Sequence, residues 1–177
     1  WFSQIISYQN KESKINSIRW IQLATVGLDG NPRVRTVVFR GWSNSYEMKI
    51  LTDRRSSKFF ELESNNNVEI CWLFPKSKCQ YRFRGIASID IGPDLIYHWE
   101  KLNTKSKSMW RWPTPGVKYI DEANGIKQYI SNIQMPGNFI LLKININLVD
   151  HLVLNKHIHI RRRWIKKKEW IEERINP

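Results

Sequence analysis

A series of short β-rich runs joined by tight turns constrains the fold of this chain more than any other feature. The runs Ile18–Leu28 and Arg33–Gly41 are rich in Val, Ile, Thr and aromatic residues, and 29-DGNP-32 between them combines the turn-forming pairs Asp-Gly and Asn-Pro. The segment 68–89 has the same pattern around a turn at 75-PKSK-78. Each of these stretches predicts an antiparallel β-hairpin.

The rest of the chain adds strands and a few helices to these hairpins. Further strands are expected at 46–52, 138–145, 148–154, 157–164 and 169–175. Helices are expected within 1–16, 58–64, 93–103 and 117–134. Hairpins that follow one another without β-α-β alternation predict a mainly β fold, an antiparallel barrel with peripheral helices packed outside it. No GxGxxG motif follows a strand, which argues against a Rossmann fold.

Length and composition narrow the class of protein. With 177 residues, 41% of them hydrophobic, the chain is expected to form one domain over residues 1–177. No run of about 18 apolar residues could cross a bilayer, and nothing resembles a secretory signal. The two cysteines, Cys71 and Cys79, form no CxxC pair and are interpreted as reduced thiols, so a cytoplasmic protein is expected.

The formal net charge of +13 favours anionic partners. Nucleic acid, a membrane surface and phosphorylated small molecules all fit this charge, which by itself does not choose among them. The run 161-RRRWIKKK-168 is the strongest nucleic-acid candidate, because it combines basic residues with an aromatic residue. A solvated turn between two strands explains the same run, and we favour that interpretation.

The run 33-RVRTVVFR-40 carries three arginines on an otherwise apolar strand. The period of two places Arg35 on one face with Val37 and Phe39, and places Arg40 on the other. Arg33 and Arg40 lie near the strand ends and can reach water, but Arg35 lies inside the strand. An unpaired guanidinium there is costly, so the sequence predicts an anionic partner for Arg35.

The segment 52-TDRRSSK-58 offers a place for such an anion. It runs from a strand end into a helix start, where Ser56 or Ser57 can act as N-cap and where free backbone N–H groups and the helix dipole favour a phosphate. Arg35 on the neighbouring strand could add a bidentate contact. A simple helix cap explains the same residues, and both interpretations stay open at this point.

Taken together, these residues resemble the pyridoxamine 5′-phosphate oxidase-related family of FMN-binding split-barrel proteins. The resemblance rests on 35-RTVVFR-40, 52-TDRRSSK-58, 72-WLFP-75, 80-QYRFRG-85, 157-HIHIR-161, Trp170 and 174-RINP-177, which follow one another in the family's order. It implies an antiparallel split β-barrel, a homodimer, and FMN held at the subunit interface.

The resemblance also implies roles for individual residues. Arg35 and Lys58 would bind the FMN phosphate, Thr36–Val38 would lie against the flavin as strand backbone, and Gln80 would reach it from the neighbouring subunit. Arg161 would approach the ring edge, where positive charge stabilises reduced flavin. The implied FMN-binding residues are Arg35, Thr36, Val37, Val38, Thr52, Asp53, Ser57, Lys58, Gln80 and Arg161.

On the substrate side the chain departs from the family's pattern. Arg40 stands in place of a lysine that contacts a substrate phosphate, and His157 in place of an arginine, whereas His159 keeps the matching histidine. Leu152 replaces a flavin-contacting tryptophan, and Ser57 replaces an arginine. The implied substrate contacts are therefore Arg40, His157 and His159, the substrate is a small molecule that could be phosphorylated, and no catalytic base is identified.

The implied activity is that of an oxidoreductase that transfers a hydride from an amine or alcohol carbon to FMN. Two alternatives remain open, a basic nucleic-acid-binding β-barrel without flavin and an FMN-binding protein without turnover. A metal at His157 and His159 is disfavoured, because no third ligand is evident nearby.

Overall fold

The structure is a computed structural model that describes residues 1–43, 46–119, 133–154 and 157–177. Its strands are β1 (Trp20–Val26), β2 (Pro32–Ser43), β3 (Glu47–Asp53), β4 (Asn67–Phe74), β5 (Cys79–Asp90), β6 (Phe139–Val153), β7 (Ile160–Lys166) and β8 (Trp170–Ile175). Its helices are α1 (Phe2–Lys11), α2 (Ser57–Ser64), α3 (Pro93–Glu100) and α4 (Thr104–Ser108), with 3₁₀ turns η1 (Asn16–Arg19) and η2 (Met109–Arg111).

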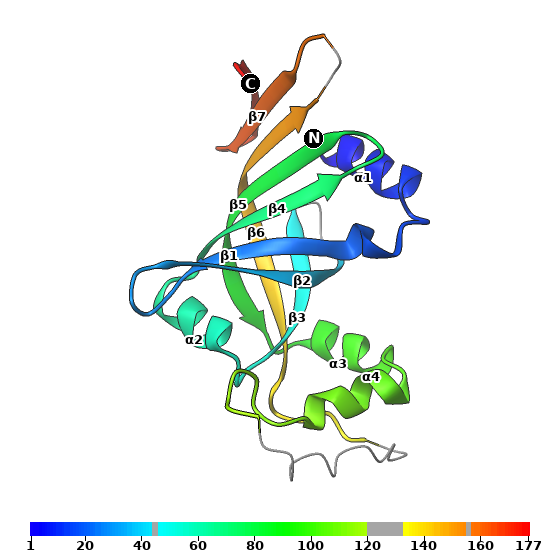
Figure 1. Cartoon of the computed structure of the whole chain (residues 1–177), viewed down its shortest axis with the longest axis vertical. Helices are drawn as coiled ribbons and strands as arrows, with labels where there is room; N and C mark the ends of the chain where they lie inside the picture. Colours follow the sequence, from blue (N-terminus) through cyan, green and yellow to red (C-terminus); the bar gives the residue numbers. More distant parts are fainter. Residues whose placement is uncertain (44–45, 120–132, 155–156) are drawn as a thin grey trace.

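The strands form one antiparallel sheet in the order β3-β2-β1-β4-β5-β6-β7-β8, and a further β3–β6 pairing closes the first six into a barrel (Figure 1). The β7–β8 hairpin extends beyond the barrel at one end, and α3 and α4 lie at the other (Figure 1). The mainly β fold and the barrel predicted from the hairpins are therefore confirmed. None of the described helices combines the length and the apolar composition needed to cross a bilayer.

The period of two in the strands fills the barrel with apolar side chains. In β3 and β5 buried residues alternate with more exposed ones, and the fully buried side chains include Trp72, Tyr81 and Phe83. Tyr81 and Phe83 stack with ring centroids 5.6 Å apart. A separate apolar cluster lies beside α3, where Trp99 packs edge-on against Phe139. These clusters hold the strands that carry the site.

One strand of the barrel differs from the prediction. The segments 138–145 and 148–154 form one continuous strand, β6, because the residues between them make a β-bulge rather than a turn. The pairing steps from Arg84–Leu148 to Gly85–Ile146, so Asn147 is the extra residue. Through this bulge β6 pairs with β3 along 139–145 and with β7 along 148–153.

Other boundaries also differ. The predicted helix 93–103 is confirmed as α3 but ends at Glu100. A further helix that was not predicted, α4, begins at Thr104, where the Asn103 side chain caps it by accepting a hydrogen bond from the Ser106 N–H at 2.8 Å. The strand expected at 157–164 begins only at Ile160. Most of the helix expected at 117–134 lies outside the described residues. Cys79 pairs with Phe74 across the hairpin, and Cys71 and Cys79 are both free thiols.

A buried histidine makes the stability of this barrel sensitive to acid. His151 is 1% exposed and stacks on Tyr81 with centroids 4.1 Å apart, and its Nε2 has no partner among the described groups. Burial, followed by the charges of Arg162 and the N-terminal amine, lowers its pKa from 6.5 to about 4. In the unfolded chain this histidine binds a proton at a higher pH than it does in the barrel.

We therefore expect the free energy of unfolding to fall by about 3 kcal/mol as the pH drops from 6.5 to 4, because only the unfolded chain takes up the proton over this interval. Urea unfolding at a series of pH values measures this slope. His151→Phe keeps an aromatic ring against Tyr81 and should flatten the profile, whereas His157→Gln, at an exposed position, should not. An unchanged slope in His151→Phe would assign the acid sensitivity to other groups.

Candidate functional site

The barrel opens between β2 and β3. Along Pro32–Val38, β2 pairs with β1, but it pairs with β3 only from Phe39 onward, where the register shifts and Gly41 has a φ of 126°. In the described part of the chain, the other edge of Pro32–Val38 thus has no strand partner. The backbone N–H and C=O groups of Val34–Val38 that point away from β1 bond to no other strand there, so they can bond to a ligand.

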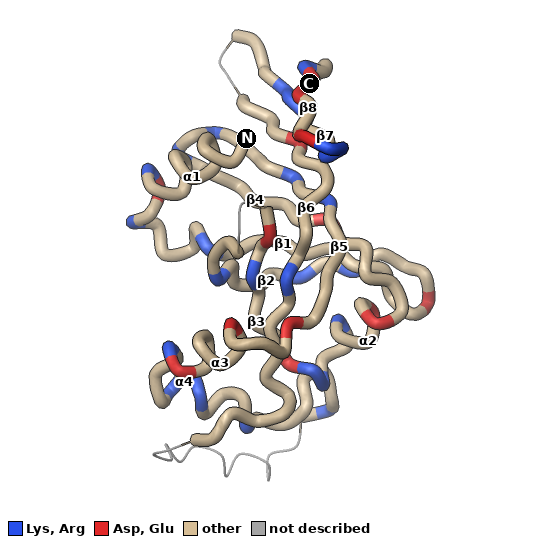
Figure 2. The backbone as a smooth tube through the Cα atoms, turned by 180° about the vertical axis from the view of Figure 1, so that it is seen from behind, with Lys and Arg blue, Asp and Glu red and all other residues tan. Residues whose placement is uncertain are grey.

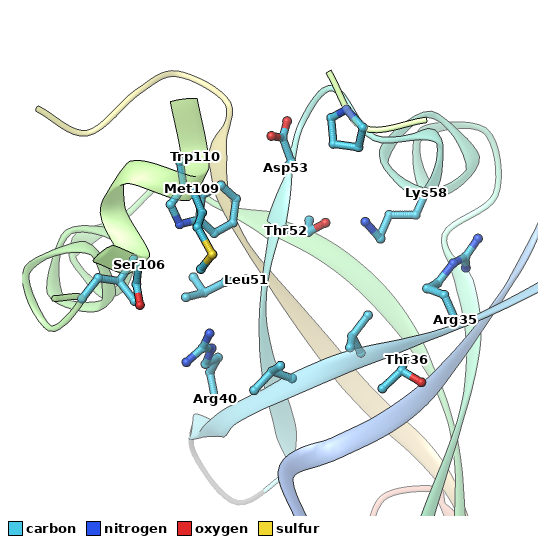
Figure 3. A pocket seen from close by; sticks show the side chains of 14 residues that line it. Arg35, Thr36, Arg40, Leu51, Thr52, Asp53, Lys58, Ser106, Met109 and Trp110 are labelled. Atoms are coloured by element: carbon cyan, nitrogen blue, oxygen red, sulfur yellow. The ribbon is translucent and has the colours of Figure 1, made fainter. Parts of the chain in front are cut away.

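A pocket of about 420 Å³ lies at this opening (Figure 3). It is lined by Arg35, Thr36, Val37, Val38, Arg40, Leu51, Thr52, Asp53, Lys58, Leu102, Ser106, Met109, Trp110 and Pro115. The strand edge brings residues of both β2 faces to the pocket, which is why Arg35 and Arg40 both line it although the period of two separates them. Seven of the ten residues proposed for FMN from the sequence are in this lining.

The anionic partner expected for Arg35 is, in this structure, a carboxylate of the protein. Arg35 Nη2 lies 2.6 Å from Glu61 Oε2, and its Nη1 donates to the Thr25 hydroxyl. That hydroxyl donates to Glu61 Oε2 at 2.5 Å. This network holds the Arg35 guanidinium where β2 separates from β3. The ion pair is largely buried, since the Glu61 side chain is only 6% exposed and the Arg35 side chain is 22% exposed.

No sequence pattern singled out Glu61. On α2, Phe59, Glu61 and Leu62 are buried, whereas Phe60 is 48% exposed. One turn of helix separates Lys58 from Glu61, so both lie on the side of α2 that faces β2. The sequence feature that could have indicated Glu61 is its spacing of three residues from Lys58 on a helix that lies near the strand of Arg35.

Lys58 completes a pair of cations. Its Nζ donates to Ser56 Oγ at 3.0 Å, and burial, together with the neighbouring charge of Arg35, lowers its pKa. Figure 3 shows Lys58 and Arg35 at the same end of the pocket. The Thr52 hydroxyl is also buried, with no hydrogen-bond partner among the described residues. Two nearby cations and an unused hydroxyl make this end suited to a dianion.

The neighbouring turn is held by a carboxylate. Asp53 accepts from Arg55 Nη2 and from Asn138 Nδ2, each at 2.8 Å. Burial opposes ionisation of Asp53, but the hydrogen bonds from Arg55 and Asn138 outweigh it and lower the pKa. Ser56 is the N-cap residue of α2 and is buried, whereas Ser57 is exposed and is not among the pocket residues. The serine hydroxyl that contacts the Lys58 ammonium is therefore that of Ser56 and not that of Ser57.

Gln80 and Arg161 lie on a different wall. Gln80 is opposite Leu152, which is opposite Arg161, so the three form one row across β5, β6 and β7. Arg161 binds the buried Asp150 with contacts of 3.0 and 2.8 Å, and these hydrogen bonds raise the pKa of Arg161. A smaller cavity of about 170 Å³ lies beside Arg161. Within one chain this row is not part of the 420 Å³ pocket.

The three substrate candidates are also divided. Arg40 lines the pocket, whereas His157 and His159 are exposed and do not. Across the described ranges, no group of three or more His, Cys, Asp or Glu side chains could hold a metal ion. The wall formed by Leu102, α4 and η2 was not foreseen, since its residues follow no pattern of ligand chemistry.

Comparisons with known proteins agree with this geometry. The family model described as pyridoxamine 5′-phosphate oxidase, FMN-binding domain, matches residues 1–90. The chain belongs to this family. A pyridoxine/pyridoxamine 5′-phosphate oxidase 2 of Arabidopsis thaliana is 31% identical over 192 residues, which cover 100% of this chain and 96% of that protein.

Solved structures extend the pyridoxamine 5′-phosphate oxidase likeness to the whole fold. A pyridoxamine 5′-phosphate oxidase-related, FMN-binding protein from Nostoc punctiforme has a TM-score of 0.91 and 31% identity, covering 100% of this chain and 97% of the other. PhzG from Burkholderia lata has a TM-score of 0.88 at 14% identity, covering 99% and 90%, and this likeness shows the fold alone. The split-barrel prediction and the resemblance drawn from the sequence are thereby confirmed.

Proposed function

We propose that this chain binds FMN in the pocket between β2 and β3 and acts as a pyridoxamine 5′-phosphate oxidase-like oxidoreductase. The observation that carries the proposal is that Arg35 and Lys58, on different elements, line one pocket at the start of α2. Membership of an FMN-binding family supports the same cofactor.

The parts of the pocket fit the parts of the cofactor. Arg35, Lys58 and the Thr52 hydroxyl would bind the phosphate, with the first backbone N–H groups of α2 nearby. The open edge at Thr36–Val38 would hydrogen-bond the polar rim of the flavin ring. The chemistry that FMN supplies in such a site is hydride acceptance from an amine or alcohol carbon. The protein would orient both molecules and exclude water.

A second copy of the chain would complete the site. Gln80 and Arg161 share a sheet face that is separate from the pocket, and exposed apolar side chains continue on the outer face of the neighbouring strands, with Trp20 at 57%, Val34 at 71% and Leu73 at 54% exposure. Burying this face in a homodimer would carry Gln80 and Arg161 to the partner's pocket. The free thiols fit a cytoplasmic protein.

Titration of the protein with FMN tests the cofactor. We expect quenched flavin fluorescence, one FMN bound per chain, and a dimer by sedimentation. Anaerobic mixing of the loaded protein with candidate amines and alcohols, read as bleaching of the flavin, separates an enzyme from an FMN-binding protein without turnover.

The rival function is nucleic-acid binding without flavin. Figure 2 shows Lys and Arg at both ends of the molecule, on the β7–β8 hairpin as well as near α4, with Asp and Glu among them. On β7, Arg161 and Arg162 contact Asp150 and Glu172. Protein that ignores FMN but binds oligonucleotides with steep salt dependence would favour this rival.

A further inference from the structure

One buried carboxylate, that of Asp150, binds several arginines where β5, β6 and β7 lie side by side (Figure 1). Asp150 is 4% exposed and lies on β6, opposite Arg82 of β5 and Arg163 of β7. Its Oδ2 accepts from Arg82 Nη2 at 3.1 Å and from Arg161 Nη2 at 2.8 Å, and it lies 3.9 Å from Arg163 Nη2. Three guanidiniums therefore share one anionic group.

Arg161 is held more closely than the other two arginines. Its Nε donates to Asp150 Oδ1 at 3.0 Å while its Nη2 donates to Oδ2, so two parallel hydrogen bonds fix the plane of the guanidinium. Among the described residues, nothing accepts a hydrogen bond from the third nitrogen, Nη1. The Asp150 carboxylate thus determines the direction in which the free N–H groups of Arg161 point.

The cavity of about 170 Å³ beside Arg161 has a surplus of positive charge. Leu148 lines it together with the carboxylates of Glu69 and Asp150 and the guanidiniums of Arg82, Arg84, Arg161 and Arg163. Glu69 lies 3.0 Å from Arg84 and 4.0 Å from Arg82, and within the described ranges it forms no ion pair with Arg161. Like charges at such distances repel, so loss of the Asp150 charge would drive the guanidiniums apart.

Asp150 keeps its charge although it is buried. Burial opposes its ionisation, but the hydrogen bonds from Arg161 and the charge of Arg82 outweigh this effect and lower the pKa of the carboxyl group. Both members of the Asp150–Arg161 pair are therefore charged at neutral pH, and the pair is broken only by changing one of the two side chains.

We propose that Asp150 is a positioning residue, which holds the Arg161 guanidinium toward the flavin of the partner subunit and so sets the reduction potential of bound FMN. This inference rests on the proposed function, since it assumes a homodimer in which Arg161 reaches the partner's FMN. Reduction by two electrons with uptake of one proton leaves a negative charge on the flavin ring, which a nearby guanidinium stabilises. This stabilisation falls with distance, so it depends on the group that holds Arg161.

The direction in which the potential moves tests this role. Asp150→Asn removes a negative charge, which by itself would favour reduced flavin and raise the potential. Loss of the Arg161 position has the opposite effect, and we expect the affinity ratio of reduced to oxidised FMN to fall about tenfold, a potential about 30 mV lower for a two-electron couple. Anaerobic reduction of FMN-loaded dimer beside a reference dye measures it. An unchanged or raised potential in Asp150→Asn would overturn the proposal.

Two further variants assign the effect to Arg161. Glu69→Gln removes the same charge from the same cavity but leaves both Asp150–Arg161 hydrogen bonds in place, so its potential should not fall. Arg161→Gln should lower the potential at least as far as Asp150→Asn, and the double variant should go no lower than Arg161→Gln. Additive falls, or an equal fall in Glu69→Gln, would show that Asp150 does not act through Arg161.

A compensated variant keeps the test decisive where Asp150→Asn alone does not fold. Arg82→Gln with Asp150→Asn removes one charge of each sign and should show the same tenfold fall, whereas Arg82→Gln alone should change the ratio less than about threefold. Protein that takes up no FMN contradicts the proposed function itself. Protein that binds FMN but whose potential does not respond to Arg161→Gln overturns only this inference.

Discussion

Arg35→Met is expected to lower the free energy of unfolding by about 3 to 5 kcal/mol and to abolish measurable FMN binding. The Glu61 side chain is 6% exposed, so removing Arg35 leaves a buried carboxylate that keeps the Thr25 hydroxyl as its hydrogen-bond donor and the charge of Lys58 nearby but has lost its ion-pair partner. The same change removes one of the two cations at the proposed phosphate position. Urea unfolding measures the first effect, and quenching of flavin fluorescence measures the second.

A double variant separates these two roles of Arg35. Arg35→Met with Glu61→Gln removes both charges and keeps an acceptor for Thr25, so most of the lost stability should return. FMN binding should not return, because the guanidinium is still missing. Arg33→Met on the same strand is the matched control, since the Arg33–Asp29 pair is exposed to solvent and should contribute little to stability. FMN binding by the double variant would disprove the phosphate role of Arg35.

Lys58→Met is expected to lower the affinity for FMN roughly 10- to 100-fold. Unlike Arg35→Met, it should not lower the free energy of unfolding. In the free protein Lys58 is partly desolvated and lies near Arg35, and both effects lower its pKa, so its charge opposes folding. Methionine keeps the apolar stem and removes the repulsion. Fluorescence titration with FMN and urea unfolding measure the two quantities.

The control for Lys58 is a lysine outside the site. Lys76→Met changes an exposed turn residue and should alter neither FMN affinity nor its dependence on salt. The salt dependence of FMN binding should become weaker in Lys58→Met, because one charge contact is lost. A Lys58→Met protein that binds FMN as tightly as the unaltered chain would show that Arg35 binds the phosphate without it.

Local sequence patterns determined most of the strands. The hairpin around 29-DGNP-32, the hairpin around 75-PKSK-78 and the start of the helix after 52-TDRRSSK-58 are read from turn formers, side-chain alternation and capping residues, which act over a few neighbours. The same local rules divided β6 into two strands at Asn147, where the structure has a bulge within one continuous strand. A bulge depends on the partner strands, and the sequence of one strand does not contain them.

For the site, the sequence by itself determined that Arg35 needs an anionic partner and that a phosphate could lie at the start of α2, because both follow from the cost of an unpaired charge and from helix geometry. Only the tertiary structure decided that Glu61 is a partner of Arg35, that β2 leaves β3 along Pro32–Val38, and that Gln80 and Arg161 lie on a separate wall. It also placed three guanidiniums around one buried carboxylate, that of Asp150. These outcomes depend on which strands pair and on which helix covers the gap between β2 and β3. Such contacts join residues far apart in the sequence, so the local spacing of residues does not indicate them.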